Sequence, residues 1–177
     1  MSSLIKSKYY IDKPPFLVDL TGENESINIL SYNLHGLNQG RPLLEDFFSA
    51  GTIDFCLIQE HWLTPHNLGA LNVINQDYGC ISSSAMEDQL SNDILRGRPY
   101  GGVAIFYKNI FADKIKILYK SSRVIILLFD DIVIVNVYFP SKGNNKSEES
   151  YNFSVLEEIF LNINEVVSKA DIVDVKL

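Results

Sequence analysis

The chain has 177 residues, of which 46% are hydrophobic and 21% are charged. This length suits one domain, and the composition is that of a globular protein rather than a disordered one. The net charge of −7 excludes a general attraction to polyanions, so any such contact has to be local or metal-assisted. Basic side chains are scattered, with one loose group at Arg96, Arg98 and Lys108.

The sequence contains no predicted membrane span. Its longest unbroken apolar run, residues 124–129, has six residues, whereas a helix needs about 20 to cross a bilayer. Residues 1–15 contain no apolar stretch of the secretory type. We therefore expect an intracellular protein, in the nucleus or the cytoplasm. Cys56 and Cys80 have neither metal-ligand nor disulfide spacing, and we expect them to be buried free thiols.

Residues 1–26 differ from the rest of the chain because they carry no clear period, contain Pro14-Pro15 and end in the polar cluster TGENES. We predict a partly disordered leader there and one domain over residues 27–177. In that domain, short apolar runs rich in Ile, Val, Phe and Tyr alternate with turn signals, which is typical of strands. The predicted strands are 27–33, 53–60, 77–83, 101–107, 113–119, 122–129 and 131–139.

Two helices are predicted between these strands and after them. Over residues 41–51, Pro42 suits the first helical position and Gly51 suits a left-handed stop. The last two strands predict a hairpin that turns near Asp130-Asp131, and its arms are apolar enough that both of their faces should be covered. Over residues 147–169, apolar residues recur at helical spacing, namely Leu156, Ile159, Phe160, Ile163, Val166 and Val167.

Polar residues stand at the ends of four predicted strands, and such groups converge when they share one edge of a sheet. Glu60 follows the apolar run 55–58. It is either an ordinary exposed acid at a strand end or a ligand for a hard cation such as Mg²⁺. Tyr138 is either strand filler or a donor to a phosphate oxygen. His35, His61 and His66 lack the spacing of a zinc cluster. The other polar strand ends are Asn33, Arg98 with Gly101-Gly102, and Asn136.

Four segments together resemble the endonuclease/exonuclease/phosphatase superfamily. They are SYNLHGLN (31–38), LIQEHWL (57–63), GRPYGGVAIFYK (97–108) and VNVYFP (135–140). Their order and spacing agree with that family over about residues 27–170. The third segment is similar to the R-x-x-GGVAI strand of the apurinic-endonuclease-like domains of non-LTR (LINE-type) retrotransposons. The resemblance is therefore closest to that subtype.

The resemblance implies the α+β class and a DNase I-like two-sheet sandwich flanked by helices, of which this chain supplies about the first half. It implies that Glu60 binds Mg²⁺ or Mn²⁺, and that Asn33 shares in the metal site or orients a phosphate. It also implies that Tyr138 contacts the scissile phosphate, with Arg98 and Asn136 as substrate-binding residues. The implied partner is DNA, held weakly and locally. The implied reaction is metal-assisted hydrolysis of a phosphodiester.

Two later motifs of the family, G-D-x-N and S-D-H, do not occur in the sequence. The chain stops at residues 170–177, where Asp174 has no asparagine two positions on. His35 stands where many members carry an acid, and a neutral imidazole suits Mg²⁺ poorly. We therefore expect the chain alone to be inactive. We also expect one mixed sheet with helices on one side and an uncovered apolar face on the other, open to a protein partner or a second copy.

Two other interpretations stay open. In the first, the chain is a non-catalytic binding or scaffold protein that retains half a domain. In the second, it is a truncated phosphoesterase for an inositol phosphate or a phospholipid. The GGVAI segment favours the retrotransposon nuclease over the second of these. Finding G-D-x-N and S-D-H motifs downstream of Leu177 in the transcript would favour the nuclease over the first.

Overall fold

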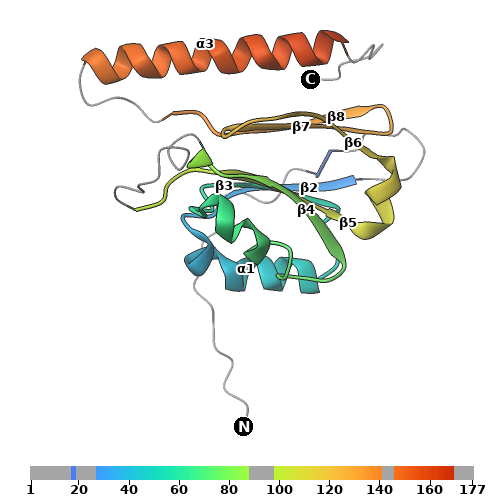
Figure 1. Cartoon of the computed structure of the whole chain (residues 1–177). Helices are drawn as coiled ribbons and strands as arrows, with labels where there is room; N and C mark the ends of the chain where they lie inside the picture. Colours follow the sequence, from blue (N-terminus) through green and yellow to red (C-terminus); the bar gives the residue numbers. More distant parts are fainter. Residues whose placement is uncertain (1–16, 19–26, 88–97, 141–145, 170–177) are drawn as a thin grey trace.

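The computed structural model describes residues 17–18, 27–87, 98–140 and 146–169. Two sheets pack face to face, and a helix lies on the outer side of each, so that the described residues form four layers (Figure 1). This arrangement confirms the predicted α+β sandwich. The first sheet, in the order β1-β2-β3-β5-β4, consists of β1 (Leu17–Val18), β2 (Ile27–Asn33), β3 (Phe55–Gln59), β5 (Val103–Lys108) and β4 (Tyr78–Ser83). The second sheet consists of β6 (Ile115–Lys120), β7 (Val124–Phe129) and β8 (Ile132–Val137).

The helices are α1 (Leu37–Ser49) beneath the first sheet and α3 (Lys146–Lys169) above the second (Figure 1). Two short 3-10 helices, η1 (Pro65–Ala70) and η2 (Asn109–Lys114), lie in the connections after β3 and β5. No helix in the described ranges is long and apolar enough to cross a membrane.

The pairing of β2 with β3 places their ends together. These two strands run parallel, with Asn33 opposite Gln59 at the last pair. Strand β5 runs antiparallel to β3, so it begins at the same edge, with Val103 opposite Gln59. In a sheet with this register, residues that follow β2 and β3 and those that precede β5 must lie close together.

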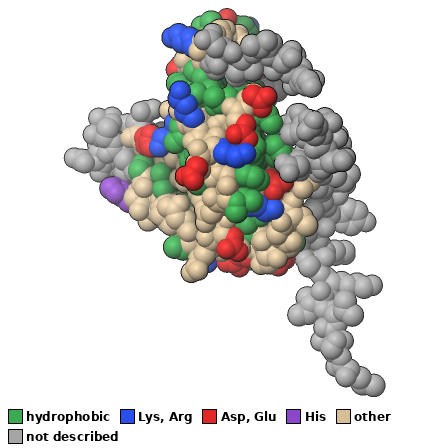
Figure 2. Space-filling view, turned by 90° about the vertical axis from the view of Figure 1, so that its right-hand side faces the viewer, with side chains coloured by type: hydrophobic (Ala, Val, Ile, Leu, Met, Phe, Trp, Pro, Cys, Tyr) green, Lys and Arg blue, Asp and Glu red, His purple; other side chains and the backbone are tan. Residues whose placement is uncertain are grey.

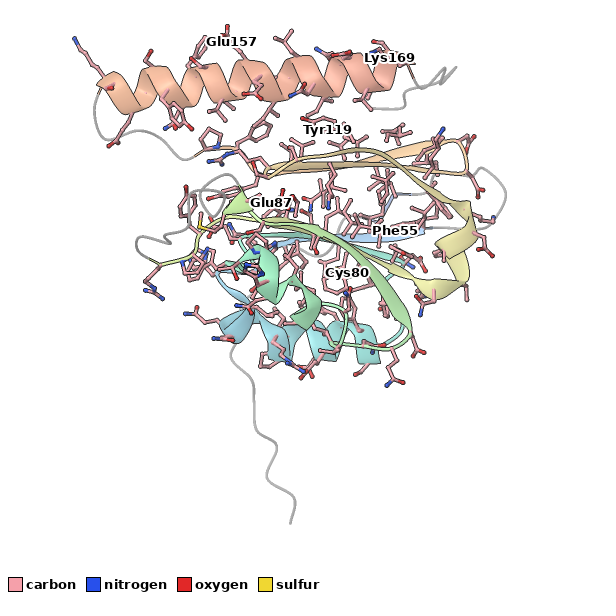
Figure 3. All side chains as sticks on the ribbon, viewed as in Figure 1. Phe55, Cys80, Glu87, Tyr119, Glu157 and Lys169 are labelled. Atoms are coloured by element: carbon pink, nitrogen blue, oxygen red, sulfur yellow. The ribbon has the colours of Figure 1, made fainter. Side chains whose placement is uncertain are left out.

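The expectation of a single sheet with an uncovered apolar face is wrong. The hairpin of β7 and β8 joins β6 in a second sheet, and this sheet covers the inner face of the first. Side chains such as Phe55 fill the space between the sheets (Figure 3). The physical reason is the hairpin's two apolar faces: Ile125 and Leu127 face the first sheet, while Val124 and Ile126 pack with α3.

Helix α1 begins at Leu37 rather than at residue 41, so Pro42 lies inside the helix and not at its first position. The chain turns at Gly36, whose φ is 94°, and the Gly40 N–H then donates to the Gly36 carbonyl over 3.1 Å. The predicted stop is confirmed, since Gly51 has a φ of 66° and its N–H caps the helix.

The predicted second helix and hairpin are also confirmed. Ile159 of α3 is buried against β7, whereas Phe160, which was expected on the same face, is 54% exposed. The hairpin turns at Asp130 and Asp131, because Phe129 pairs directly with Ile132. Of residues 1–26, the structure describes only the two residues of β1, which pair with β2. The domain boundary at residue 27 therefore stays a prediction.

Candidate functional site

A short hydrogen bond joins the two sheets at the edge where β2 and β3 end. The Tyr138 hydroxyl, just beyond β8, donates to Oε1 of Glu60, just beyond β3, over 2.5 Å. The other carboxylate oxygen, Oε2, lies 3.2 Å from Nδ1 of His35. The Glu60 side chain is 14% exposed. Solvent therefore still reaches a carboxylate that protein groups flank on both oxygens.

Hydrogen bonds decide the charge of this pair. The Asn33 amide and the Trp62 indole N–H also hydrogen-bond to the Glu60 carboxylate. Burial by itself raises the pKa of Glu60, but the hydrogen bonds and the nearby His35 outweigh burial and lower that pKa. Burial and contact with this carboxylate raise the pKa of Tyr138 to about 12. At neutral pH the pair is an ionised carboxylate and a protonated phenol.

The backbone around this pair adopts an unusual conformation. Among the described residues only four other than glycine have a positive φ, and three of them are His35 at 54°, Glu60 at 58° and Trp62 at 55°. This left-handed region is unfavourable for residues with a Cβ, and it concentrates at functional sites. Neighbouring segments hold it in place, since Glu60 O accepts from Gly36 N–H at 2.7 Å and Trp62 N–H donates to Gly101 O at 3.0 Å.

His61 supports the turn from beneath and is not exposed to a ligand. Its side chain is 0% exposed. Nδ1 accepts from the Leu63 N–H at 3.0 Å, so the Nε2–H donates to the Ser83 carbonyl at 3.0 Å. Burial lowers the pKa of this imidazole, which is therefore neutral. Gly102, at a φ of 84°, packs directly on the ring, because a Cβ there would lie 2.3 Å from His61.

Asn136, an expected substrate-binding residue, lies in the core between the sheets and is 1% exposed. Its Nδ2 donates to the carbonyls of Ile58 and Ala104, at 2.9 Å each. Its Oδ1 accepts from Gln59 Nε2 at 2.7 Å. The side chain therefore ties β8 to β3 and β5 two residues before Tyr138, and it has no face open to solvent.

Arg98, the other expected substrate-binding residue, lies at the rim of the site. Its Cζ is 5.8 Å from the centre of the Trp62 ring. The expected basic group does not form around it. Lys108 lies at the far end of β5 and pairs with Asp54 at 2.8 Å, and Arg96 lies outside the described residues.

The arrangement fits an ion of the Mg²⁺ type in its donor chemistry. Glu60 supplies an ionised and partly exposed carboxylate, and Asn33 supplies an amide oxygen next to it that now accepts from the His35 N–H at 3.1 Å. Such ions take oxygen ligands and are often held by one or two carboxylates together with phosphate. In the described part of the chain, no group of three or more His, Cys, Asp or Glu side chains is placed to hold a metal. An ion here would need oxygens from phosphate or water.

Sequence reasoning missed two residues of the site. Trp62 was not singled out, although it donates to Glu60. Arg123, whose Cζ lies 5.6 Å from the centre of the Tyr138 ring, was also missed. The Trp62 contact had a signal, since Trp62 lies two positions after Glu60 in LIQEHWL. The Arg123 contact had none, because it depends on how β7 and β8 pair.

No protein-family model matches the chain, and no curated protein does either. Solved structures do match it. The 3' phosphatase NExo from Neisseria, bound to a product DNA hairpin, has a TM-score of 0.55 and 20% identity, over 80% of this chain and 51% of that chain. An AP endonuclease from Archaeoglobus fulgidus has a TM-score of 0.53 and 16% identity, over 75% of this chain and 49% of that one.

A third match is the AP endonuclease LMAP from Leishmania major, with a TM-score of 0.53 and 17% identity, over 80% of this chain and 50% of that one. The chain therefore spans about half the length of these solved structures. At such identities the likeness concerns the fold. The chain has the DNase I-like two-sheet fold of these proteins over about half their length.

Proposed function

We propose that the Glu60 edge is the metal- and phosphate-binding part of a site that hydrolyses phosphodiesters of DNA. One observation carries the proposal. The 2.5 Å contact between Tyr138 and Glu60 joins, across the two sheets, an ionised carboxylate and a phenol that keeps its proton. The fold supports it, because the solved structures that share the fold are named as a 3' phosphatase and AP endonucleases.

In this proposal each residue has one task. Glu60 holds the divalent cation, Mg²⁺ or Mn²⁺, and Asn33 orients that carboxylate through its amide. Tyr138 contacts the scissile phosphate by turning its single O–H from Glu60 Oε1 to a phosphate oxygen, and Arg98 neutralises a neighbouring phosphate. When bound, the cation supplies Lewis-acid stabilisation of the charge that develops on the phosphate. Asn136 acts indirectly, because its buried amide fixes β8 and with it the place of Tyr138.

We further propose that the chain by itself does not hydrolyse DNA at a detectable rate. The described residues bring no second carboxylate to Glu60 that could activate a water molecule. His35 contacts the Glu60 carboxylate through Nδ1, so in this arrangement its ring helps to hold that carboxylate. The retrotransposon subtype rests on residues 97–108 alone and stays a prediction, as does a location in the nucleus or the cytoplasm.

The proposal is tested by metal-dependent DNA binding. We expect Mn²⁺ to tighten binding of a labelled DNA oligonucleotide, measured by fluorescence anisotropy, because a cation held by Glu60 would offset the charge of a phosphate. Glu60→Gln should abolish the effect of Mn²⁺. Glu165→Gln, a matched change on the exposed surface of α3, should leave it unchanged. An effect of Mn²⁺ that survives in Glu60→Gln would contradict the proposal.

Nicking of supercoiled plasmid in Mg²⁺ tests the second part. We expect no detectable nicking by the wild-type chain. Robust nicking that disappears in Glu60→Ala would confirm the class of reaction and overturn the claim that the chain alone is inactive. Nicking that persists in Glu60→Ala would place the reaction outside this site.

A further inference from the structure

Three planar side chains lie beside the Glu60 carboxylate, namely His35, Trp62 and Arg98. We call this surface the aromatic ledge. The ring centres of His35 and Trp62 are 5.7 Å apart with an angle of 33° between the planes. The Arg98 guanidinium lies 5.8 Å from the Trp62 ring centre. We propose that this ledge stacks an unpaired nucleobase. This inference rests on the function proposed above. The DNA on which the site acts is then single-stranded or locally unpaired.

The ledge is fixed before any ligand arrives. Trp62 is held at its edge by the hydrogen bond from its indole N–H to Glu60. It is backed by Gly36, since a Cβ at that position would lie 2.6 Å from the Trp62 ring. A rigid ring loses little conformational entropy on binding, which makes it an efficient contact surface.

The ledge also remains accessible. The His35 side chain is 72% exposed, Arg98 lies on the surface, and Trp62 between them is half-buried. Imidazole, indole and guanidinium planes are the groups on which unstacked bases rest in proteins that bind single strands. In an intact duplex each base is already stacked on its neighbours, so its face is not available to the ledge. The geometry therefore favours an unpaired base over a duplex.

The net charge of the chain also favours an unpaired strand over a duplex. The net charge is −7, and on the face shown in Figure 2, which is the η2 end of the sandwich away from the ledge (Figure 1), acidic and basic side chains are interspersed. Proteins that bind a duplex non-specifically do so mainly by neutralising phosphates. With that contribution weak, stacking near Glu60 supplies the larger share of the affinity, and binding should depend only weakly on salt.

The test uses labelled short oligonucleotides in EDTA, so that no metal contributes. We expect the single strand to bind more tightly than the same sequence as a duplex, by fluorescence anisotropy. Trp62 is the only tryptophan, so its emission should be quenched as the single strand binds. Trp62→Leu should weaken binding about tenfold or more, whereas Trp62→Phe, which keeps a ring, should lose much less.

Matched variants keep the outcome clear. Phe153→Leu removes an exposed aromatic ring on α3, at 61% exposure, and should leave binding unchanged. Arg98→Gln should weaken binding, and Lys116→Gln, an exposed cation on β6, should not. Circular dichroism must show that each variant is folded. A duplex that binds as tightly as the single strand would overturn the proposal, as would unchanged single-strand binding by folded Trp62→Leu.

The two proposals fail separately. Glu60→Gln should lose the Mn²⁺ effect but keep single-strand binding in EDTA, because the amide oxygen of the substituted side chain can still accept from the Trp62 indole N–H. If Trp62→Leu binds normally while Glu60→Gln loses the Mn²⁺ effect, the ledge is wrong and the metal site stands. If single-strand binding depends on the ledge while Mn²⁺ has no effect, the ledge stands and the proposed hydrolytic site is wrong.

Discussion

At one end of the sandwich the two sheets meet through aromatic rings, and at the other end they meet through polar hydrogen bonds. At the first end, the ring centres of Phe55 and Phe111 each lie 5.0 Å from that of Phe129. At the second, Asn136 and Tyr138 of one sheet hydrogen-bond to the other. We call these the aromatic end and the polar end.

The difference separates stability from positioning. Apolar contact at the aromatic end is non-directional and gains free energy roughly in proportion to the area removed from water. A hydrogen bond at the polar end adds little net stability, but it fixes the relative orientation of the two groups that it joins. Breaking it leaves the buried partner without a hydrogen bond, which costs free energy. The polar end also contains the left-handed residues around Glu60. The aromatic end therefore stabilises the fold, whereas the polar end positions the strained residues around Glu60.

Truncation of a ring at the aromatic end should have the largest effect on stability. Phe55 is 0% exposed, so Phe55→Ala should lower the free energy of unfolding by about 3–5 kcal/mol. Phe160→Ala, at a ring that is 54% exposed, should cost under about 1 kcal/mol. Urea denaturation measures both. Equal losses would contradict the account of the aromatic end.

A methyl group under the site should have the next largest effect. Gly102→Ala places a Cβ 2.3 Å from His61 at a φ of 84°, so we expect a loss of about 2–4 kcal/mol from steric overlap and backbone strain. Gly51→Ala is the matched control, because its φ is 66° with no atom within 4 Å. It should lose only the strain contribution, about 1–2 kcal/mol. Comparable losses would show that His61 yields easily.

Removal of the buried amide tests whether polar contacts join the sheets at the polar end. Asn136→Ala leaves the Ile58 and Ala104 carbonyls and the Gln59 amide without this partner. We expect a loss of about 2–3 kcal/mol in unfolding free energy. Asn109→Ala, at an exposed hydrogen bond, should lose under about 1 kcal/mol. A similar small loss at both positions would mean that Asn136 contributes little.

The smallest expected effect is alkaline sensitivity near the aromatic end. Burial, with the charge of Asp54 nearby, raises the pKa of Tyr78 above its ordinary value of 10.0. The unfolded chain therefore releases this proton first, so the contribution of Tyr78 is complete below pH 10.0 and is lost as the pH rises through the folded pKa. Tyr78→Phe should remove that part of the pH dependence. It should also lose about 1 kcal/mol at neutral pH, because the hydroxyl donates to Ile53 O at 2.6 Å. If the free energy of unfolding, measured by urea denaturation, falls with alkaline pH as steeply in Tyr78→Phe as in the wild type, this account is wrong.

The sequence predicted the elements well where local pattern decides them. The seven predicted strands and the helix over 147–169 all appear, because alternation and helical spacing are local properties. The predicted start of α1 was wrong, because glycines such as Gly36 and Gly40 are typical of a turn rather than of a helix. In the fold, Gly36 supplies the left-handed residue before the helix, and Gly40 packs against Leu34, whose Cδ1 would lie 2.0 Å from an added Cβ.

The layers and the finer parts of the site were harder to predict. The sequence showed that both faces of the β7–β8 hairpin are apolar, but it did not show that this hairpin covers the first sheet. The convergence of Asn33, Glu60 and Tyr138 was predictable from their places after strands. The burial of Asn136 was not, because only tertiary packing distinguishes a polar side chain between two sheets from one at their edge.

The most direct test of the central claim is calorimetric titration of Mn²⁺ into the folded chain. The Glu60 carboxylate is ionised and partly exposed, so we predict one binding site per chain that disappears in Glu60→Gln and persists in Glu165→Gln. Tyr138→Phe, which removes the hydroxyl on Oε1, should change the affinity without removing the site. Binding that is unchanged in Glu60→Gln, or no binding by the folded wild-type chain, would contradict the claim that this edge is a metal and phosphate site.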